Sequence, residues 1–172
     1  NYEAPGNTIS VVDLVARRWH LPETKNQRDH TIHLSSFAVR QFESLAALKE
    51  SGKDGQPLPW VFPNSAGEGP VCIKSFGKQL SDRQRPPEKR MQHRAKATGS
   101  LVLAGGKWTA HDLRRTAATL MAQQGISADV IDECLNHVIE SRVRRTYIRD
   151  RRLAEQARAF DALGSRLAEL VD

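Results

Sequence analysis

Four side chains in the last third of the chain have the types and spacing needed to act on a phosphodiester. His111 and Arg114 lie three residues apart, His137 follows Arg114 by 23 residues, and Tyr147 follows ten residues later among arginines. The planar fork of an Arg makes two parallel charge-assisted hydrogen bonds to a phosphate. A His donates to a phosphate oxygen or moves a proton, and a Tyr in strongly positive surroundings can act as a nucleophile. With Lys25, far upstream, these side chains predict a catalytic site.

The first two of these residues are expected in the opening turn of a helix. Thr109 and Asp112 form a capping-box pattern, and Gly125 is the type of residue that ends a helix. Residues three apart on a helix share a face, so His111 and Arg114 are expected to point the same way. The helix N-terminus adds backbone N–H groups and a dipole that favour the same anion.

The next helix is expected to bring His137 back toward the same place. Its N-cap is Ser127, and it ends near Asn136. Asp and Glu residues do not cluster near the candidate residues, so phosphoryl transfer by two metal ions is not expected. The pattern predicts metal-free nucleophilic catalysis through a protein–phosphate ester, without a cofactor.

Each candidate residue also has an ordinary interpretation. A His-x-x-Arg pair alone is usually a solvated helix face, and His137 fits a histidine that interacts with the dipole at a helix C-terminus. Tyr147 alone is most often a packing residue, and Lys25 alone is most often a solvated loop tip. The order and spacing of the whole set favour the site.

Composition narrows the class of protein. With 172 residues, 39% of them hydrophobic and 27% charged, the chain fits one domain with a core. It has no apolar run long enough to cross a bilayer, and its two isolated cysteines fit a reducing cytosol without a disulfide or structural zinc. The net charge of +6 indicates a nucleic-acid partner. Much of it lies in residues 83–98, which are expected to form a basic mobile loop.

The fold class follows from the periodicity of apolar residues. Three short β-branched or aromatic segments, ISVVDL, ARRWHLP and HTIHLS, predict a three-stranded antiparallel sheet whose second hairpin carries Lys25 at its tip. Helical stripes follow over 36–50 and 71–80, then the two helices described above, a short helix or turn over 143–148, and a long helix over 153–170. Leu113, Leu153 and Leu170 are expected on buried faces. The sequence therefore predicts a mainly helical α+β domain.

Several stretches carry a family resemblance. HDLRRTAATLMAQQGISADVIDECLNH followed by RRTYIRD closely resembles the catalytic domain of tyrosine recombinases, the phage and prophage integrases in particular. WHLPETKNQRDHTIHLS is similar to the strand–hairpin–strand of that family, and AVRQFESLAAL and WVFP also correspond. The resemblance covers nearly all of residues 1–172, with 83–104 the least familiar part, and it implies the fold of that catalytic domain.

The resemblance implies site-specific DNA recombination, as in prophage integration or excision. Tyr147 attacks a DNA phosphate, forms a 3′-phosphotyrosyl link and releases a 5′-hydroxyl. Arg114 and His137 bind the phosphate, His111 assists proton transfer at the nucleophile, and Lys25 is the acid for the leaving oxygen. A 5′-hydroxyl of a partner strand then reverses the step without ATP.

The resemblance also implies partners and a location. The partners are double-stranded DNA at attachment sites and further copies of the chain in a tetramer, with no membrane. The location is the bacterial cytoplasm, with the nucleoid. The last helix, over residues 153–170, is expected either to pack against a neighbouring protomer or to fold back onto its own core.

One departure from the family concerns the start of the chain. The family has an additional phosphate-binding Arg in a Gly-x-Arg-x-x-Glu-like helix before the first strand. The chain starts at Asn1 without that helix or the usual DNA-clamping domains, and Arg17 and Arg18 do not match the missing Arg. We therefore expect a catalytic-domain fragment that does not cleave DNA efficiently alone. The alternatives are a nicking and closing enzyme like the type IB topoisomerases and a DNA-binding module without catalysis.

Overall fold

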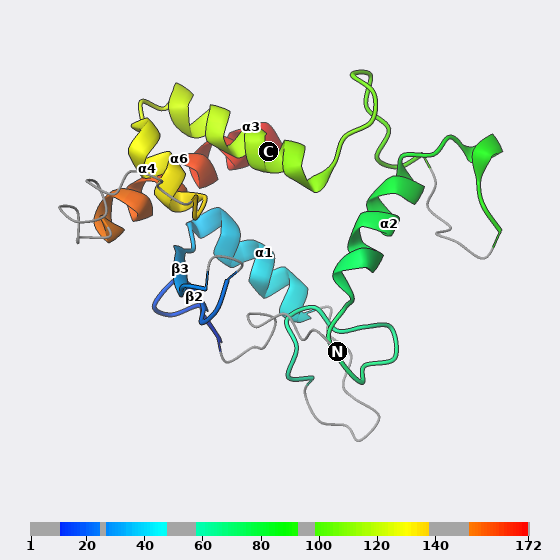
Figure 1. Cartoon of the computed structure of the whole chain (residues 1–172), viewed down its shortest axis with the longest axis horizontal. Coiled ribbons are helices and arrows are strands. Elements are labelled where there is room, and N and C mark those ends of the chain that lie inside the picture. The colour runs from blue at the N-terminus through cyan, green and yellow to red at the C-terminus, as the bar shows by residue number, and fades with distance from the viewer. Residues whose placement is uncertain (1–10, 25–26, 48–57, 93–98, 138–151, 172) are drawn as a thin grey trace.

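The computed structural model describes residues 11–24, 27–47, 58–92, 99–137 and 152–171. In chain order the elements are β1 (Val12–Asp13), β2 (Arg18–Leu21), β3 (His30–His33), α1 (Ser36–Ala47), α2 (Ile73–Arg83), the 3-10 helix η2 (Pro87–Lys89), α3 (Ala110–Gln123), α4 (Ala128–Cys134) and α6 (Leu153–Val171). Figure 1 shows α1, α3, α4 and α6 gathered around the sheet, while α2 stands apart. The fold is mainly helical α+β, as predicted.

The sheet is the predicted three-stranded antiparallel one, with β2 in the centre. Trp19 of β2 pairs with Val12 of β1 on one side and with Ile32 of β3 on the other. The turn between β1 and β2 is closed by a hydrogen bond from Ala16 N–H to Asp13 Oδ1 at 2.7 Å. Both hairpins lie where the sequence predicted them.

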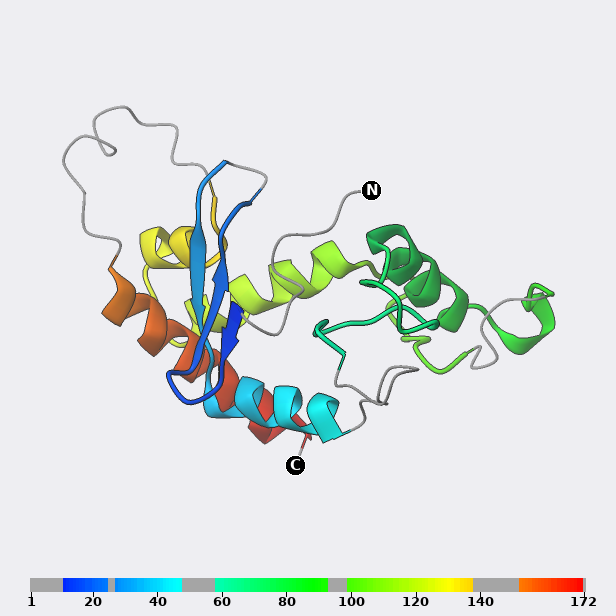
Figure 2. The same cartoon turned by 90° about the horizontal axis from the view of Figure 1, so that it is seen from below.

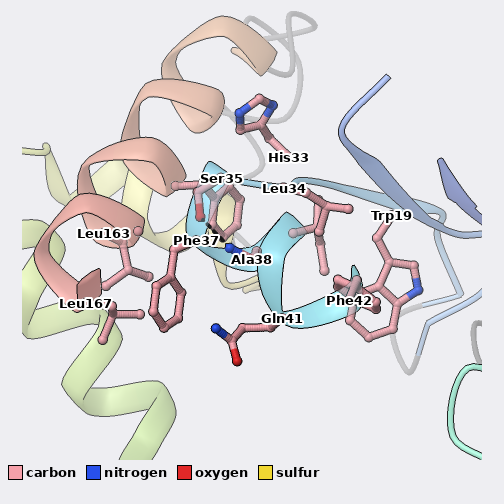
Figure 3. A pocket seen from close by; sticks show the side chains of 13 residues that line it. Trp19, His33, Leu34, Ser35, Phe37, Ala38, Gln41, Phe42, Leu163 and Leu167 are labelled. Carbon is pink, nitrogen blue, oxygen red and sulfur yellow. Dashed lines mark hydrogen bonds between the residues drawn. The ribbon is translucent and has the colours of Figure 1, made fainter. Parts of the chain in front are cut away.

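A small apolar pocket marks the packing of the sheet and α1 against α6. The Ser35 hydroxyl caps α1 by accepting from the Ala38 N–H at 3.2 Å, and Trp19 meets Phe42 edge to face with ring centroids 5.5 Å apart. The pocket, about 330 Å³ in volume, lies among these residues and α6, and Figure 3 shows Phe37 turned toward Leu163. The candidate site residues that the structure describes, His111, Arg114 and His137, do not line it.

The main core lies where α3, α4 and α6 meet. Its buried members are Met121 of α3, Val130, Ile131 and Cys134 of α4, and Ala159 of α6. Met121 is only 1% exposed. Full burial of a side chain of this size contributes about 1.5–3 kcal/mol. The predicted buried faces of α3 and α4 are therefore confirmed at these positions.

α3 ends where the sequence placed its terminal glycine. Gly125 has a φ of 78°, in the left-handed region that favours glycine. Its N–H donates to Ala122 O at 3.0 Å, and the N–H of Ile126 donates to Met121 O at 3.2 Å. This pair of bonds is the Schellman motif. The reversal folds α4 back against α3, and Ile126 packs on the core.

A polar cluster ties α6 to the sheet. Arg17, which precedes β2, donates from Nε to Leu34 O at 2.9 Å and from Nη2 to Asp161 of α6 at 3.1 Å. His33 Nε2 lies 3.1 Å from the other oxygen of Asp161. α6 also contacts α1, α3 and α4. Of the two arrangements expected for the last helix, the structure has the one that folds back on its own chain.

Three apolar residues that were expected to be buried are exposed. Leu113 is 53% exposed, and Leu153 and Leu170 are each 56% exposed. The buried positions of α6 include the small residues Ala159 and Gly164. Small side chains let the backbone of α6 approach the neighbouring elements closely. The large apolar residues of α6 therefore lie beside this contact. Figure 2 shows that the first turns of α3, which carry Leu113, reach past α6 toward α2.

The side chain of Gln84 links the end of α2 to the residue before the N-cap of α3. The Gln84 amide, directly after α2, donates to Trp108 O at 2.8 Å and accepts from Trp108 N–H at 2.9 Å. Phe76, on the expected apolar stripe of the 71–80 helix, is 52% exposed. Part of the predicted basic loop 83–98 is ordered, because Arg83 ends α2 and residues 87–89 form η2. Residues 93–98 lie outside the described part, so the mobility of the loop stays a prediction.

The short helix expected over 143–148 also lies outside the described residues. Among the helices that are described, none has the length and hydropathy of a membrane span.

Gly164 provides a test of the packing between α6 and α1. A Cβ at this position would overlap the Ser35 side chain, the cap of α1. We expect Gly164→Ala to lower the free energy of unfolding by about 1–3 kcal/mol, the usual range for overpacking. The matched control is Gly77→Ala in α2, where an added Cβ meets nothing within 4 Å. Gly77→Ala is expected to stabilise by about 0.5–1 kcal/mol. Urea unfolding measures both, and equal effects would contradict the close approach.

Candidate active site

The start of α3 is fixed by the predicted capping box. Thr109 is the N-cap, and its backbone N–H and hydroxyl donate to Asp112 Oδ2 at 2.9 and 2.8 Å. The hydrogen bond from the Thr109 hydroxyl, helped by the one from its N–H, lowers the pKa of the Asp112 carboxyl below its ordinary value. His111 lies in this first turn with an exposed side chain. The cap therefore orders the backbone that carries His111.

Arg114 reaches from α3 to the C-terminal end of α4. Its Nη2 donates to the carbonyl oxygen of Leu135, the C-cap residue of α4. Carbonyl groups at a helix end lack partners within the helix and carry partial negative charge, so a guanidinium is well suited to them. Because Leu135 is two residues before His137, this bond brings the predicted phosphate-binding Arg close to the second His.

The end of α4 is a Schellman motif built on an asparagine. Asn136 has a φ of 52°, and its N–H donates to Glu133 O at 3.0 Å. The His137 N–H donates to Asp132 O at 2.9 Å. The His137 side chain points back as well, with Nδ1 2.8 Å from Asp132 Oδ1. His137 is therefore held by both its backbone and its ring.

The second hairpin of the sheet meets α4 at this turn. The side-chain amide of Asn136 donates to Thr24 Oγ1 at 3.1 Å, and the same hydroxyl donates to Arg28 O at 2.9 Å. Gln27 N–H closes the hairpin by donating to Thr24 O at 2.9 Å. Lys25, the residue after Thr24, lies outside the described residues. Thr24, which precedes Lys25 in the chain, is hydrogen-bonded to Asn136, which precedes His137.

The structure thus connects the segments that carry Arg114, His137 and Lys25. Of the five predicted site residues, it describes His111, Arg114 and His137. Arg114 and His137 meet through the end of α4, and the hairpin of Lys25 is joined to the same turn. Among the described residues, no hydrogen bond or ion pair joins His111 to them. Tyr147 lies outside the described part of the chain.

Three residues that support this arrangement were not among the predicted site residues, namely Thr24, Asp132 and Asn136. An Asn directly after a helix is a known left-handed C-cap, so Asn136 had a readable signal. The contacts of Thr24 and Asp132 depend on that turn, and no local sequence pattern predicts them.

Two further features bear on the chemistry available. Across the residues that the structure describes, no group of three or more His, Cys, Asp or Glu side chains is arranged to hold a metal ion. Both cysteines are free thiols. Burial raises the pKa of the Cys134 thiol to about 12, so this residue acts as an apolar part of the core.

The lowered pKa of Asp112 predicts a pH dependence of stability. A carboxyl whose pKa is lower in the folded state contributes stability above its unfolded pKa, and this contribution is lost as the pH falls through the folded value. We therefore expect acidification to destabilise the wild-type chain more than Asp112→Asn. Urea unfolding of both proteins between neutral pH and pH 3 measures the difference, and parallel curves would contradict the role of the cap.

The hydrogen bond from Asn136 to Thr24 is expected to hold the second hairpin against α4. Asn136→Gly keeps a residue that tolerates the left-handed backbone but removes the amide that binds Thr24. We expect faster hydrogen exchange at the amides of Thr24 and Gln27, while the His137 amide, which bonds within α4, keeps its protection. Unchanged exchange in the hairpin would mean that the contact with Asn136 does not hold it.

Comparison with known proteins adds a family to this geometry. The model of the phage integrase family matches residues 3–153. The chain is 28% identical over 140 residues to the prophage integrase IntA of Escherichia coli strain K12, covering 80% of the chain and 28% of that relative's length. No solved structure gives a significant match. The family match covers most of the chain and includes the capped start of α3 and the turn at the end of α4. The chain belongs to the phage integrase family, the tyrosine recombinases that its sequence resembles.

Proposed function

We propose that the chain is the catalytic part of a DNA strand-exchange enzyme that works through a 3′-phosphotyrosine. Tyr147 is the nucleophile toward a DNA phosphate, Arg114 and His137 bind that phosphate, and His111 assists proton transfer. Lys25 gives a proton to the leaving 5′-oxygen. The tyrosyl ester keeps the energy of the broken phosphodiester, so a 5′-hydroxyl can reverse the step without ATP.

The observation that carries the proposal is the convergence at the end of α4. Leu135 accepts from Arg114 of α3, and Asn136 binds Thr24 beside Lys25. The second hairpin of the sheet, α3 and the end of α4 thus meet beside His137. The Arg114 guanidinium, the His137 imidazole and, in this proposal, the Lys25 ammonium provide the donors that a phosphate oxygen needs.

The described residues on either side of Tyr147 both lie at α4. His137 follows the C-terminal end of α4. Arg152 lies 4.0 Å from Asp129 and 3.8 Å from Glu133 on α4. Tyr147 itself lies outside the described residues, and its role as nucleophile beside His137 is part of the proposal.

The substrate and partners proposed are those of an integrase. The relative's name, prophage integrase, and the net charge of +6 favour duplex DNA at attachment sites, with excision as the reverse reaction. Strand exchange between two duplexes requires more than one catalytic centre, which favours a tetramer. Because the chain spans only 28% of that relative's length, the activity is proposed for the protein at its full natural length.

Trapping the covalent intermediate tests the nucleophile. A duplex nicked close to the cleavage site loses the short strand with its 5′-hydroxyl, so the protein stays attached. We expect a protein–DNA adduct with the full-length protein and none with Tyr147→Phe, because a phenyl ring has no oxygen to attack. The chain has only one other tyrosine, so Tyr2→Phe is the matched control and should keep the adduct.

The same assay separates the competing activities. An adduct that rejoins to a partner strand supports recombination, whereas rejoining only to the original strand would make the protein a topoisomerase-like nicking and closing enzyme. DNA binding without any adduct would leave a binding module and overturn the proposal. An adduct that survives in Tyr147→Phe would place the nucleophile elsewhere.

A further inference from the structure

α4 carries three carboxylates, and two of them face a different basic partner from the third. Asp129 and Glu133, four residues apart on one face, both approach Arg152. Asp132 faces the other way and accepts a hydrogen bond from His137 Nδ1 at 2.8 Å. Within the described residues, Asp132 has no other basic partner. Its charge is therefore not used to anchor the chain at Arg152.

The contact between Asp132 and His137 exists only because the helix reverses. Residues five apart on a continuous helix are rotated by about 140° from each other and do not face. The left-handed Asn136, with a φ of 52°, turns the chain back. As a result the His137 N–H reaches Asp132 O at 2.9 Å while the ring reaches the carboxylate. The two residues are joined twice.

We propose that Asp132 is a positioning residue that fixes the tautomer and direction of the His137 imidazole. An ionised carboxylate only accepts hydrogen bonds, so Nδ1 must carry the proton. Nε2, across the ring, then faces away from Asp132, and among the described residues it has no hydrogen-bond partner. The His137 side chain is 47% exposed, so the imidazole is partly accessible to a ligand.

The fixed tautomer determines what His137 can do at the proposed site, so this inference rests on the proposed function. In the neutral ring, Nε2 carries a lone pair that accepts a proton or a hydrogen bond from an O–H group. In the protonated ring, Nε2–H donates to a phosphate oxygen. In both states the reactive nitrogen keeps one direction, because the other nitrogen is held by Asp132. Asp132 itself touches no substrate and acts through His137.

The tautomer can be measured without DNA. Long-range ¹H–¹⁵N spectra of the 172-residue chain distinguish Nδ1–H from Nε2–H rings. We expect His137 to be the Nδ1–H tautomer, to lose that preference in Asp132→Ala, and to keep it in Asp132→Asn, whose amide oxygen still accepts from Nδ1–H. The rings of His20 and His111 in the same spectra are internal controls and should not change. An Nε2–H tautomer in the wild type, or an unchanged His137 in Asp132→Ala, would overturn the proposal.

The variants are expected to fold. Asp132 lies near the C-terminus of α4, where a negative charge opposes the helix dipole, so its removal should not weaken the helix. Far-ultraviolet circular dichroism and urea unfolding check this, and Asp132→Asn, which keeps the shape of the side chain, serves as the second variant. A cooperative transition in Asp132→Ala is sufficient for the tautomer comparison, and the tautomer of the wild-type chain tests the proposal in either case.

Cleavage by the full-length protein tests whether the position of the ring matters. We expect Asp132→Ala to slow single-turnover cleavage by about ten- to a hundredfold, the loss typical when a group that orients a metal-bound imidazole is removed. DNA affinity should be unchanged, and Asp132→Asn should recover much of the rate. In a His137→Ala background, Asp132→Ala should have no further effect, because its role passes through the ring. An equal loss in that background would overturn the proposal. A wild-type protein that forms no adduct would instead refute the proposed function, while the spectra still decide the tautomer.

Discussion

The candidate site depends on one backbone conformation, the left-handed turn at Asn136. For a residue other than glycine this conformation costs about 1–2 kcal/mol, and Asn tolerates it better than most. Two backbone hydrogen bonds at the end of α4 and one side-chain bond to Thr24 offset the cost. The reversal leaves the carbonyl of Leu135 open to Arg114 and turns His137 back toward the helix. Three consecutive residues are therefore held by three different parts of the molecule.

α6 joins the helices to the sheet and so helps to fix the position of this turn. Asp161 of α6 accepts from Arg17 directly before β2, and Gly164 lets α6 approach the start of α1. The second hairpin is thus held at its base by α6 and near its tip by Asn136. The second hairpin is therefore connected to α4 directly near its tip and through α6 at its base.

Structural features that depend on a few neighbouring residues could be predicted from the sequence. Contacts between residues distant in the sequence could not. The capping box of Thr109 and the glycine end of α3 at Gly125 depend on neighbours within five positions, and both were predicted correctly. The exposure of Leu113 depends on how far α4 and α6 reach along α3, which helical periodicity does not encode. Asp132 was missed for a related reason, because a left-handed residue breaks the periodicity that relates positions on a helix.

In the proposed site, Arg114 interacts with two sources of negative potential, the C-terminus of α4 and a DNA phosphate. The C-terminus of α4 carries partial negative charge, equivalent to roughly half an elementary charge, so on its own it would repel a phosphate. The guanidinium of Arg114 donates one N–H to that terminus through Leu135 O. Its fork has five donors in fixed directions, so others remain for an anion. A Lys has one point charge on a flexible stem and cannot hold both directions so rigidly. The proposed anion site beside a helix C-terminus is therefore better served by an arginine than by a lysine, and the Leu135 carbonyl that Arg114 binds holds the guanidinium at this place.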